Sequence, residues 1–433
     1  MRTKDKIQRV NIITLGCSKN RVDSEVLLTQ LRSNQIEAEH ETRRKSNIVI
    51  INTCGFIDKA KEESIQAIVE YAEKKKKGKI EKLYVTGCLS ERYKNDLSIE
   101  LPEVDAFFGT MELPSLLKKF NVDYKKELLG ERVITTDSHY AYLKISEGCN
   151  RPCSFCAIPL MRGKHVSRTI ESLVDEAKFL VSRGVKELIL IAQDLTFFGL
   201  DLYNERKLSE LLYRLSDIER LEWIRLQYAY PSGFPLDILK PIKERPNICK
   251  YLDMPLQHAS NDMLKSMKRG ITKEKTYELL HTIKQEIPDI ALRTTFIVGY
   301  PNETENDFLE LCNFVQEIQF DRVGVFTYSH EENTAAYSLN DNVPEQLKEQ
   351  RKAELMLIQQ DISWKKNQTK IGKIFKVLID RKEGNFFIGR TEHDSPEVDN
   401  EVVIESSHLT IGEFYPVLIE KAEEFDLFGK VVS

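Results

Sequence analysis

Six of the eight cysteines fall into two sets whose spacing could support metal chemistry. Cys149, Cys153 and Cys156 form a C-x-x-x-C-x-x-C motif directly after an alternating apolar run, 140–146. Soft thiolates prefer iron–sulfur clusters or zinc to hard cations, and four-iron clusters usually take four cysteines. A set of three therefore predicts one iron with an open position for chemistry. The alternatives are a coincidental group of buried thiols or a structural zinc site, which would need a fourth ligand at similar spacing, whereas His165 is nine residues on.

The second set, Cys17, Cys54 and Cys88, is spread over the first ninety residues. Each cysteine follows a short β-branched run and precedes a helical pattern, as in the βαβ units of a parallel sheet. The runs are 10–16, 47–53 and 82–87, and the helical patterns are 22–31, 59–74 and a weaker one after residue 90.

These three cysteines are expected at the carboxyl ends of neighbouring strands, where ligands gather in open α/β sheets. Gly16, Gly55 and Gly87 flank them and would let the backbone approach closely. We therefore predict a second three-thiolate site on a Rossmann-like parallel sheet. Three unrelated core thiols are the alternative, because free cysteine is often buried.

The first motif resembles that of the radical S-adenosylmethionine (SAM) enzymes. The resemblance implies a 4Fe–4S cluster held by Cys149, Cys153 and Cys156, which would be the catalytic residues. The open iron would chelate SAM, whose reductive cleavage gives a 5′-deoxyadenosyl radical that abstracts hydrogen. An electron donor such as flavodoxin or ferredoxin is then expected as a partner.

Both cysteine sets together resemble the methylthiotransferases, over essentially the whole chain. The segment 14–25, TLGCSKNRVDSE, is closest to the branch that methylthiolates the β-carbon of an aspartate in ribosomal protein S-12. The tRNA-modifying branch usually has Gln-Met-Asn after this cysteine, where this chain has Ser18-Lys19-Asn20. Ser18 is a departure, since proline is frequent there in the protein-modifying branch. The resemblance implies two 4Fe–4S clusters, with methyl transfer to sulfur at the Cys17, Cys54 and Cys88 cluster.

Alternating patterns in the middle of the chain predict a partial (βα)6 barrel with its site at the carboxyl ends of the strands. Gln193 and Asp194 follow one strand, and Arg293 lies in another; we expect all three to bind SAM, with Arg293 pairing its carboxylate. The strand candidates are 140–146, 187–192, 223–228, 250–254, 291–298 and 322–328, and the helix candidates are 169–182, 208–218, 273–286 and 303–318.

The last part of the chain predicts a long helix, 344–366, and then a small antiparallel β-barrel from the strands 371–379, 385–390, 401–405 and 414–419. This part resembles the TRAM domain, commonly an RNA-binding module. Residues 371–433 carry seven Lys and Arg against thirteen Asp and Glu, a net charge of −6. Because RNA grooves are basic, the tail is expected to avoid RNA and attract a basic protein; acidity that only maintains solubility is the alternative.

The sequence as a whole predicts an α/β enzyme of three domains: a methylthiotransferase N-terminal domain at 8–125, a radical SAM core at 135–366 and a TRAM domain at 368–433. No apolar run approaches the ~20 residues of a membrane span, and residues 1–6 lack a signal-peptide core, so a cytoplasmic protein is expected. The rival functions are methylthiolation of tRNA adenosine, which predicts a basic tail, and an iron–sulfur scaffold without catalysis.

Overall fold

The computed structural model of the chain describes residues 8–128 and 130–432. Residues 1–6, in which the sequence predicts no signal peptide, lie outside the described residues. The described residues group into two compact units. The amino-terminal unit holds residues up to 136, together with 142–150 and 157–180; the carboxy-terminal unit holds 137–141, 151–156 and 181 onward. No helix among the described residues is long and apolar enough to cross a membrane.

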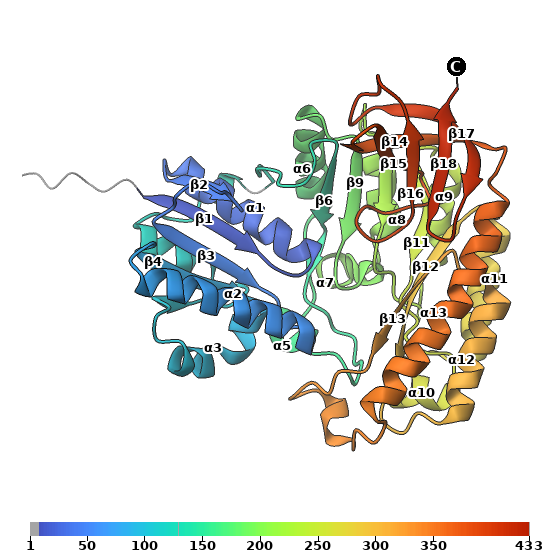
Figure 1. The fold of residues 1–433 in the computed structure, drawn as a ribbon, viewed down its shortest axis with the longest axis horizontal. Coiled ribbons are helices and arrows are strands. Elements are labelled where there is room, and N and C mark those ends of the chain that lie inside the picture. Colours follow the sequence, from blue (N-terminus) through green and yellow to red (C-terminus); the bar gives the residue numbers. More distant parts are fainter. Residues whose placement is uncertain (1–7, 129, 433) are drawn as a thin grey trace, which may run out of the picture. The chain divides into compact units, whose positions relative to one another are not determined.

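The amino-terminal unit is built on a five-stranded sheet in the order β2-β1-β3-β4-β5, with all neighbours parallel. Side chains alternate along each strand, so Ile50 packs with α1 on one face and Ile51 with α2 on the other. Figure 1 shows these two helices on opposite sides of the sheet. The elements are β1 (Arg9–Thr14), α1 (Ser18–Ser33), β2 (Glu37–His40), β3 (Ile48–Thr53), α2 (Asp58–Lys76), β4 (Lys82–Gly87), α3 (Cys88–Glu100), β5 (Ala106–Phe107) and α4 (Leu113–Leu117).

The six-stranded sheet of the middle region follows the order β13-β12-β11-β10-β9-β6, and β9 to β13 pair in parallel. The two ends of the sheet do not pair, so it is an open, partial barrel. Its strands are β6 (Tyr140–Lys144), β9 (Glu187–Ile191), β10 (Trp223–Leu226), β11 (Ile248–Asp253), β12 (Ala291–Val298) and β13 (Arg322–Thr327).

Each predicted strand and helix of this region is present, with shifts of a few residues at the ends. The helices are α5 (Ile158–Arg162), α6 (Ile170–Ser182), α7 (Leu200–Tyr203), α8 (Leu208–Ser216), α9 (Leu239–Glu244), α10 (Asn261–Ser266), α11 (Lys273–Glu286), α12 (Glu305–Ile318) and α13 (Glu345–Gln368). A two-stranded ribbon, β7 (Ser146–Glu147) and β8 (Val166–Ser167), was not predicted.

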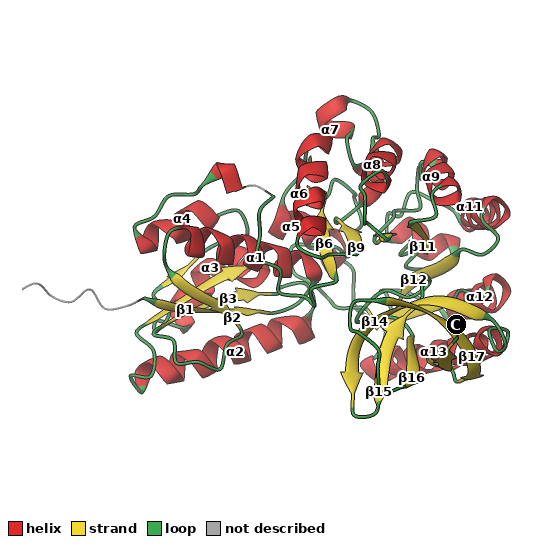
Figure 2. Cartoon of the chain, turned by 90° about the horizontal axis from the view of Figure 1, so that it is seen from above, coloured by secondary structure: helices red, strands yellow, loops and turns green. Residues whose placement is uncertain are grey.

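The carboxy-terminal strands form a closed barrel in the order β14-β15-β16-β18-β17, seen in Figure 2 beside α13. Four neighbouring pairs are antiparallel, as expected for this small barrel, and the pair β16 and β18 is parallel. The strands are β14 (Ile374–Glu383), β15 (Phe386–Arg390), β16 (Glu401–Glu405), β17 (Phe414–Ala422) and β18 (Asp426–Val431).

This barrel packs against the amino-terminal halves of the parallel strands within the same unit. Leu378 and Phe414 contact Trp223, Cys249 and Tyr251 in one apolar cluster. Buried ion pairs surround the cluster, and each joins an acidic or basic residue of the barrel to a partner outside it: Arg390 with Glu187, His139 with Asp380, Arg322 with Asp394, and Arg293 with Asp399. Three acidic side chains of the tail, Asp380, Asp394 and Asp399, therefore form buried ion pairs within the protein.

Asp380 should make the carboxy-terminal unit sensitive to acid. Burial opposes its charge, but Arg390 and His139 lower the pKa of Asp380 from 3.8 to about 2. A lowered carboxyl pKa stabilises the fold above pH ~4, and this contribution of roughly 2 kcal/mol is lost as pH falls from 4 towards 2. Asp380→Asn should lower the free energy of unfolding near neutral pH and flatten its decline below pH ~4.

Chemical denaturation at a series of pH values would measure both effects. The control is Asp289→Asn, because the Asp289 side chain is 78% exposed and its ion pair with Lys250, at 3.8 Å, should contribute little to stability. An Asp380→Asn protein with the same acid profile as the unaltered chain would contradict the prediction.

Candidate functional site

The three amino-terminal cysteines lie at the carboxyl edge of the parallel sheet, directly after its three central strands. Cys17 precedes α1, Cys54 follows β3, and Cys88 is the first residue of α3 after β4. Since β1, β3 and β4 are neighbours, their carboxyl ends meet at one edge. The structure therefore brings together the second set of cysteines in the manner that the sequence indicates.

The glycines beside these cysteines keep the edge open. A Cβ on Gly16 would lie 2.9 Å from Cys54 Sγ, and one on Gly87 would lie 2.5 Å from the carbonyl oxygen of Thr53. Gly16 and Gly87 also have φ angles of +90° and +98°, which side-chain-bearing residues rarely adopt. A cradle lined by three thiols and closed to any added Cβ fits an iron–sulfur cluster better than three unrelated core thiols.

Burial opposes the ionisation of Cys54 and Cys88. Burial, together with the nearby Cys17 and Cys88, raises the pKa of Cys54 to about 12. Burial also raises the pKa of Cys88, although Arg162 acts in the opposite direction. Cys17 is exposed. Because metal ligands must be thiolates, loading of a cluster here has to displace protons from the protein.

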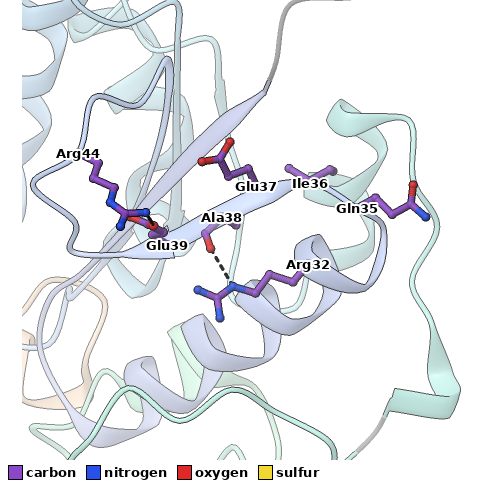
Figure 3. A pocket seen from close by; sticks show the side chains of 7 residues that line it. All are labelled: Arg32, Gln35, Ile36, Glu37, Ala38, Glu39 and Arg44. Carbon is purple, nitrogen blue, oxygen red and sulfur yellow. Dashed lines mark hydrogen bonds and ion pairs between the residues drawn. The ribbon is translucent and has the colours of Figure 1, made fainter.

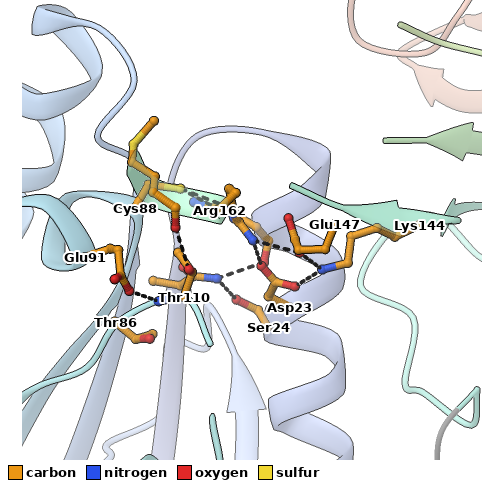
Figure 4. A network of polar contacts seen from close by, with 12 residues as sticks. Asp23, Ser24, Thr86, Cys88, Glu91, Thr110, Lys144, Glu147 and Arg162 are labelled. Atoms are coloured by element: carbon orange, nitrogen blue, oxygen red, sulfur yellow. Dashed lines mark hydrogen bonds and ion pairs between the residues drawn. The ribbon is translucent and has the colours of Figure 1, made fainter. Parts of the chain in front are cut away.

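A buried polar network surrounds Cys88, as Figure 4 shows. Arg162 Nε donates a hydrogen bond to Cys88 Sγ at 3.3 Å, and its Nη1 contacts Asp23 at 2.6 Å and Glu147 at 3.2 Å. Lys144 bridges the same two carboxylates. Burial disfavours the charged guanidinium, but Asp23 holds the pKa of Arg162 well above its ordinary value, so the arginine is a cation. Sequence reasoning missed Arg162, because no spacing connects it to Cys88.

The cysteines of the second motif are divided between the two units. Cys149 follows β7 in the amino-terminal unit, where its amide donates to the carbonyl of Gly163 at 3.1 Å. Cys153 and Cys156 belong to the carboxy-terminal unit, where the amide of Cys156 donates to the carbonyl of Cys153 at 3.2 Å. Among the described residues no group of three or more His, Cys, Asp or Glu could hold a single metal ion.

The Cys153 loop is fastened to the carboxy-terminal unit by several contacts. The amide of Ser154 donates to the carbonyl of Met267 at 3.1 Å, and its hydroxyl donates to the carbonyl of Ser266 at 2.8 Å. Arg269 Nη1 donates to Cys153 Sγ at 3.1 Å, and the Tyr230 hydroxyl lies 3.6 Å from the same sulfur. A fixed loop with a thiol held by a cation fits a thiolate ligand of a cluster.

The three residues expected to bind SAM occupy different environments. Gln193 and Asp194 follow β9 at its carboxyl end, as expected. The Asp194 carboxylate is occupied, accepting hydrogen bonds from the Thr196 amide at 2.8 Å and from Arg151 Nε at 2.7 Å. Arg293 is the third residue of β12, in its amino-terminal half, where it contacts Asp253 at 3.1 Å and Asp399 at 3.3 Å. Arg293 therefore lies inside the strand and not at its carboxyl end, and its guanidinium is paired with these two carboxylates.

Arg151 is a residue of the motif itself that the sequence analysis did not single out. Its guanidinium lies 3.9 Å from the Tyr230 ring centroid and 4.3 Å from that of Phe197. Its position between Cys149 and Cys153 was the sequence signal that could have identified it.

His165 was considered as a zinc ligand. Its Nε2 lies 3.0 Å from the Ser167 hydroxyl. Cys249 and Cys312, the two cysteines outside both sets, are buried.

Hollows on the described surface include one in each compact unit. One, of about 420 Å³, lies at the edge strand β2 (Figure 3). Its arginines are bonded within it, Arg32 to the carbonyl of Ala38 and Arg44 to Glu39. The other, of about 710 Å³, lies in the carboxy-terminal unit beside Pro152, the residue before Cys153, and is lined in part by lysines, Lys265, Lys268 and Lys275.

Comparison with known proteins agrees with this organisation. Three family models match successive parts of the chain: Uncharacterized protein family UPF0004 at 9–109, the Radical SAM superfamily at 143–315 and the TRAM domain at 371–432. The "Ribosomal protein uS12 methylthiotransferase RimO" of Cytophaga hutchinsonii is 63% identical over 98% of this chain and 98% of its own length. The protein of the same name from Flavobacterium johnsoniae is 60% identical, over 99% of this chain and 100% of its own. This chain belongs to the RimO family.

Solved structures share the fold of this RimO-family chain at much lower identity. The radical S-adenosylmethionine methyltransferase TsrM from Kitasatospora setae matches with a TM-score of 0.52 and 14% identity, covering 74% of this chain and 75% of that one. The cobalamin-dependent S-adenosylmethionine radical enzyme OxsB gives a TM-score of 0.52 and 14% identity, covering 82% of this chain and 56% of that one. Membership of the RimO family and the Radical SAM match imply a 4Fe–4S cluster and SAM as cofactors.

Proposed function

We propose that this protein is a radical SAM methylthiotransferase that inserts a methylthio group at the β-carbon of an aspartate in ribosomal protein S-12. One observation carries the proposal: three cysteines lie at the carboxyl edge of one parallel sheet, in a chain that also has the C-x-x-x-C-x-x-C motif after the first strand of a second. The close relatives are named as methylthiotransferases of ribosomal protein uS12. A scaffold without catalysis would not need a second set of thiols with a vacant iron.

The six cysteines are proposed as the ligands of two clusters. Cys17, Cys54 and Cys88 would hold one, and Cys149, Cys153 and Cys156 would hold the other as the catalytic set. When bound, the clusters and SAM supply the radical and sulfur chemistry that side-chain acids and bases cannot perform on an unactivated C–H bond. The chain supplies the thiolates, the glycine cradle and the arginines that hold Cys88 and Cys153 in place.

For the SAM pocket, the placement of the residues favours Gln193 over the other two candidates. Gln193 lies at the carboxyl end of β9, where barrels of parallel strands bind their ligands. Asp194 would act indirectly, by orienting Arg151. Arg293 would serve the attachment of the carboxy-terminal barrel, since it is paired with Asp399 there.

A basic protein partner is proposed for the carboxy-terminal barrel. Asp380, Asp394, Asp399 and Arg390 have buried side chains, so they add little to the surface charge. The remaining residues of 371–433 still include ten acidic and six basic side chains. Since nucleic-acid affinity depends on phosphate neutralisation, this surface favours a basic ribosomal protein over RNA.

Three further assignments are also proposed. The lysine-lined hollow beside Pro152 would suit an acidic electron donor such as flavodoxin or ferredoxin, because it adjoins the residue before Cys153. The enzyme would work in the cytoplasm, where ribosomes are. The domains would run 8–125, 135–366 and 368–433, near the ranges of the three family matches.

Substrate choice tests the proposed function. The reconstituted protein, kept anaerobic with SAM and a reductant, should add a methylthio group to an S-12 peptide and none to bulk tRNA, as measured by mass spectrometry. The matched control is the same peptide with asparagine in place of the modified aspartate. A gain on tRNA alone would keep the chemistry and overturn the substrate.

A further inference from the structure

Each set of cysteines contains one thiol that accepts a hydrogen bond from a buried arginine. Arg162 donates from Nε to Cys88 at 3.3 Å within the amino-terminal unit. Arg269 donates from Nη1 to Cys153 at 3.1 Å within the carboxy-terminal unit. Arg162 is 5% exposed and Arg269 is 3% exposed, so neither contact is an encounter of mobile surface side chains.

We propose that Arg162 and Arg269 are positioning residues that raise the reduction potentials of the two clusters, each through one cysteine sulfur. The inference rests on the proposed two-cluster function. It assigns a matched role to two residues on different elements, one at the end of α5 and one after α10.

The surroundings of Arg162 balance its charge. Asp23 and Glu147 accept from its Nη1, and Lys144 contacts both carboxylates, so two cations face two anions before Cys88 is counted. These ion pairs fix the plane of the guanidinium and leave Nε directed at the sulfur. Arg162 should therefore act on Cys88 mainly through the N–H···S hydrogen bond.

Arg269 is not balanced in this way. Its Nη2 donates to the carbonyl of Pro255 at 2.5 Å, and its guanidinium lies 4.2 Å from the Tyr230 ring centroid. In the described part of the chain no carboxylate pairs with it, and its buried Nε has no hydrogen-bond partner. As a cluster ligand, the Cys153 sulfur would be a negative group in contact with this guanidinium, so Arg269 should act through its charge as well as its hydrogen bond.

The direction of the effect follows from the charge of the cluster. Reduction adds an electron, and a nearby N–H donor or cation stabilises the more negative state. Cluster potentials are set in part by hydrogen bonds to the sulfurs, by net charge and by solvent exposure. Loss of either arginine should make its own cluster harder to reduce, and loss of Arg269 should have the larger effect.

The test titrates each cluster alone. A protein with Cys149, Cys153 and Cys156 all changed to Ala keeps only the amino-terminal cluster, and one with Cys17, Cys54 and Cys88 changed to Ala keeps only the other. Arg162→Lys and Arg269→Lys are each placed in both backgrounds, because lysine keeps the charge but has no donor at the Nε position. Arg269→Met removes the charge too. Anaerobic redox titration followed by electron paramagnetic resonance gives each midpoint, and iron analysis gives the loading.

The expected result is specific to the contact. Arg162→Lys should shift only the amino-terminal cluster, and Arg269→Lys only the other, each serving as the control for its counterpart. Arg269→Met should lower the ratio of reduced to oxidised cluster at least tenfold at the parent midpoint, which corresponds to ~59 mV for one electron. Arg269→Lys should produce a smaller shift in the same direction.

The outcomes separate the inference from the function on which it rests. If a three-cysteine background binds no iron–sulfur cluster, the two-cluster assignment fails, and the inference fails with it. If the backgrounds load fully but the arginine variants keep the parent midpoints, the assignment stands and the inference is wrong. Iron loss in the arginine variants, or equal shifts of both clusters, would also overturn it in favour of a general structural role.

Discussion

Cys153→Ala is expected to reduce 5′-deoxyadenosine formation to background. Cys153 supplies one of three thiolates in a set with no spare ligand, and Arg269 holds its sulfur in place. With two thiolates left, the cluster and its open iron cannot be retained in the geometry that SAM cleavage requires. Anaerobic incubation with SAM and a strong reductant, followed by chromatography, measures the product.

Cys17→Ala is the matched control, since it removes one cysteine from the other set. Deoxyadenosine formation should stay close to that of the unaltered protein, while transfer of the methylthio group to the S-12 peptide should cease. If both variants retain full transfer, the assignment of the two cysteine sets is wrong.

Glu187→Ala should cost more stability than other single changes at the attachment of the carboxy-terminal barrel. The Glu187 carboxylate is fully buried and contacts Arg225 at 2.7 Å and Arg390 at 2.8 Å. Burial opposes its ionisation, but the two arginines lower the pKa of Glu187, so it is charged. Removing one partner of a buried ion pair typically costs about 3–5 kcal/mol, because the remaining charge is left without compensation.

Denaturation of the two variants Glu187→Ala and Glu222→Ala would test this difference. Glu222 also forms an ion pair that reaches the barrel, with Lys376 at 2.7 Å, but both side chains are about half exposed. Its loss should cost at most ~1 kcal/mol. Equal losses in the two variants would show that burial does not decide the strength of these contacts.

The sequence predicted correctly those elements whose bounds depend on neighbouring residues in the chain. The helix 273–286 has the bounds expected from the sequence, because Thr272 caps its first turn by accepting from the Lys275 amide. The strand 291–298 also has its expected bounds, as a buried parallel strand with a β-branched, apolar sequence. Position in the chain was enough to bring Cys17, Cys54 and Cys88 to one edge, because parallel strands align their carboxyl ends.

Contacts between distant segments could not be read in the same way. The strand β2, with the sequence Glu-Ala-Glu-His, is a short polar edge strand whose pairing with β1 gives it its structure. The strand β18 was missed although it closes the barrel, because its pairing with β16 is parallel and depends on the whole topology. Arg293 was expected on chemical grounds to pair the SAM carboxylate, but its partner Asp399 lies 106 residues away. Arg162 lies 74 residues from Cys88, and nothing in the spacing connects them.

The buried attachment of the carboxy-terminal barrel has a consequence for the exchange of domains between relatives. Arg225, Arg293 and Arg322 lie in the parallel strands, and their partners on the barrel side are backbone carbonyls, Asp399 and Asp394. A barrel taken from an enzyme with a different substrate would bring different residues to these arginines. Such a chimaera would need matching changes in the parallel strands as well as in the barrel. We therefore expect a new substrate preference to arise more readily by substitutions on the outer face of this barrel than by exchange of the whole barrel.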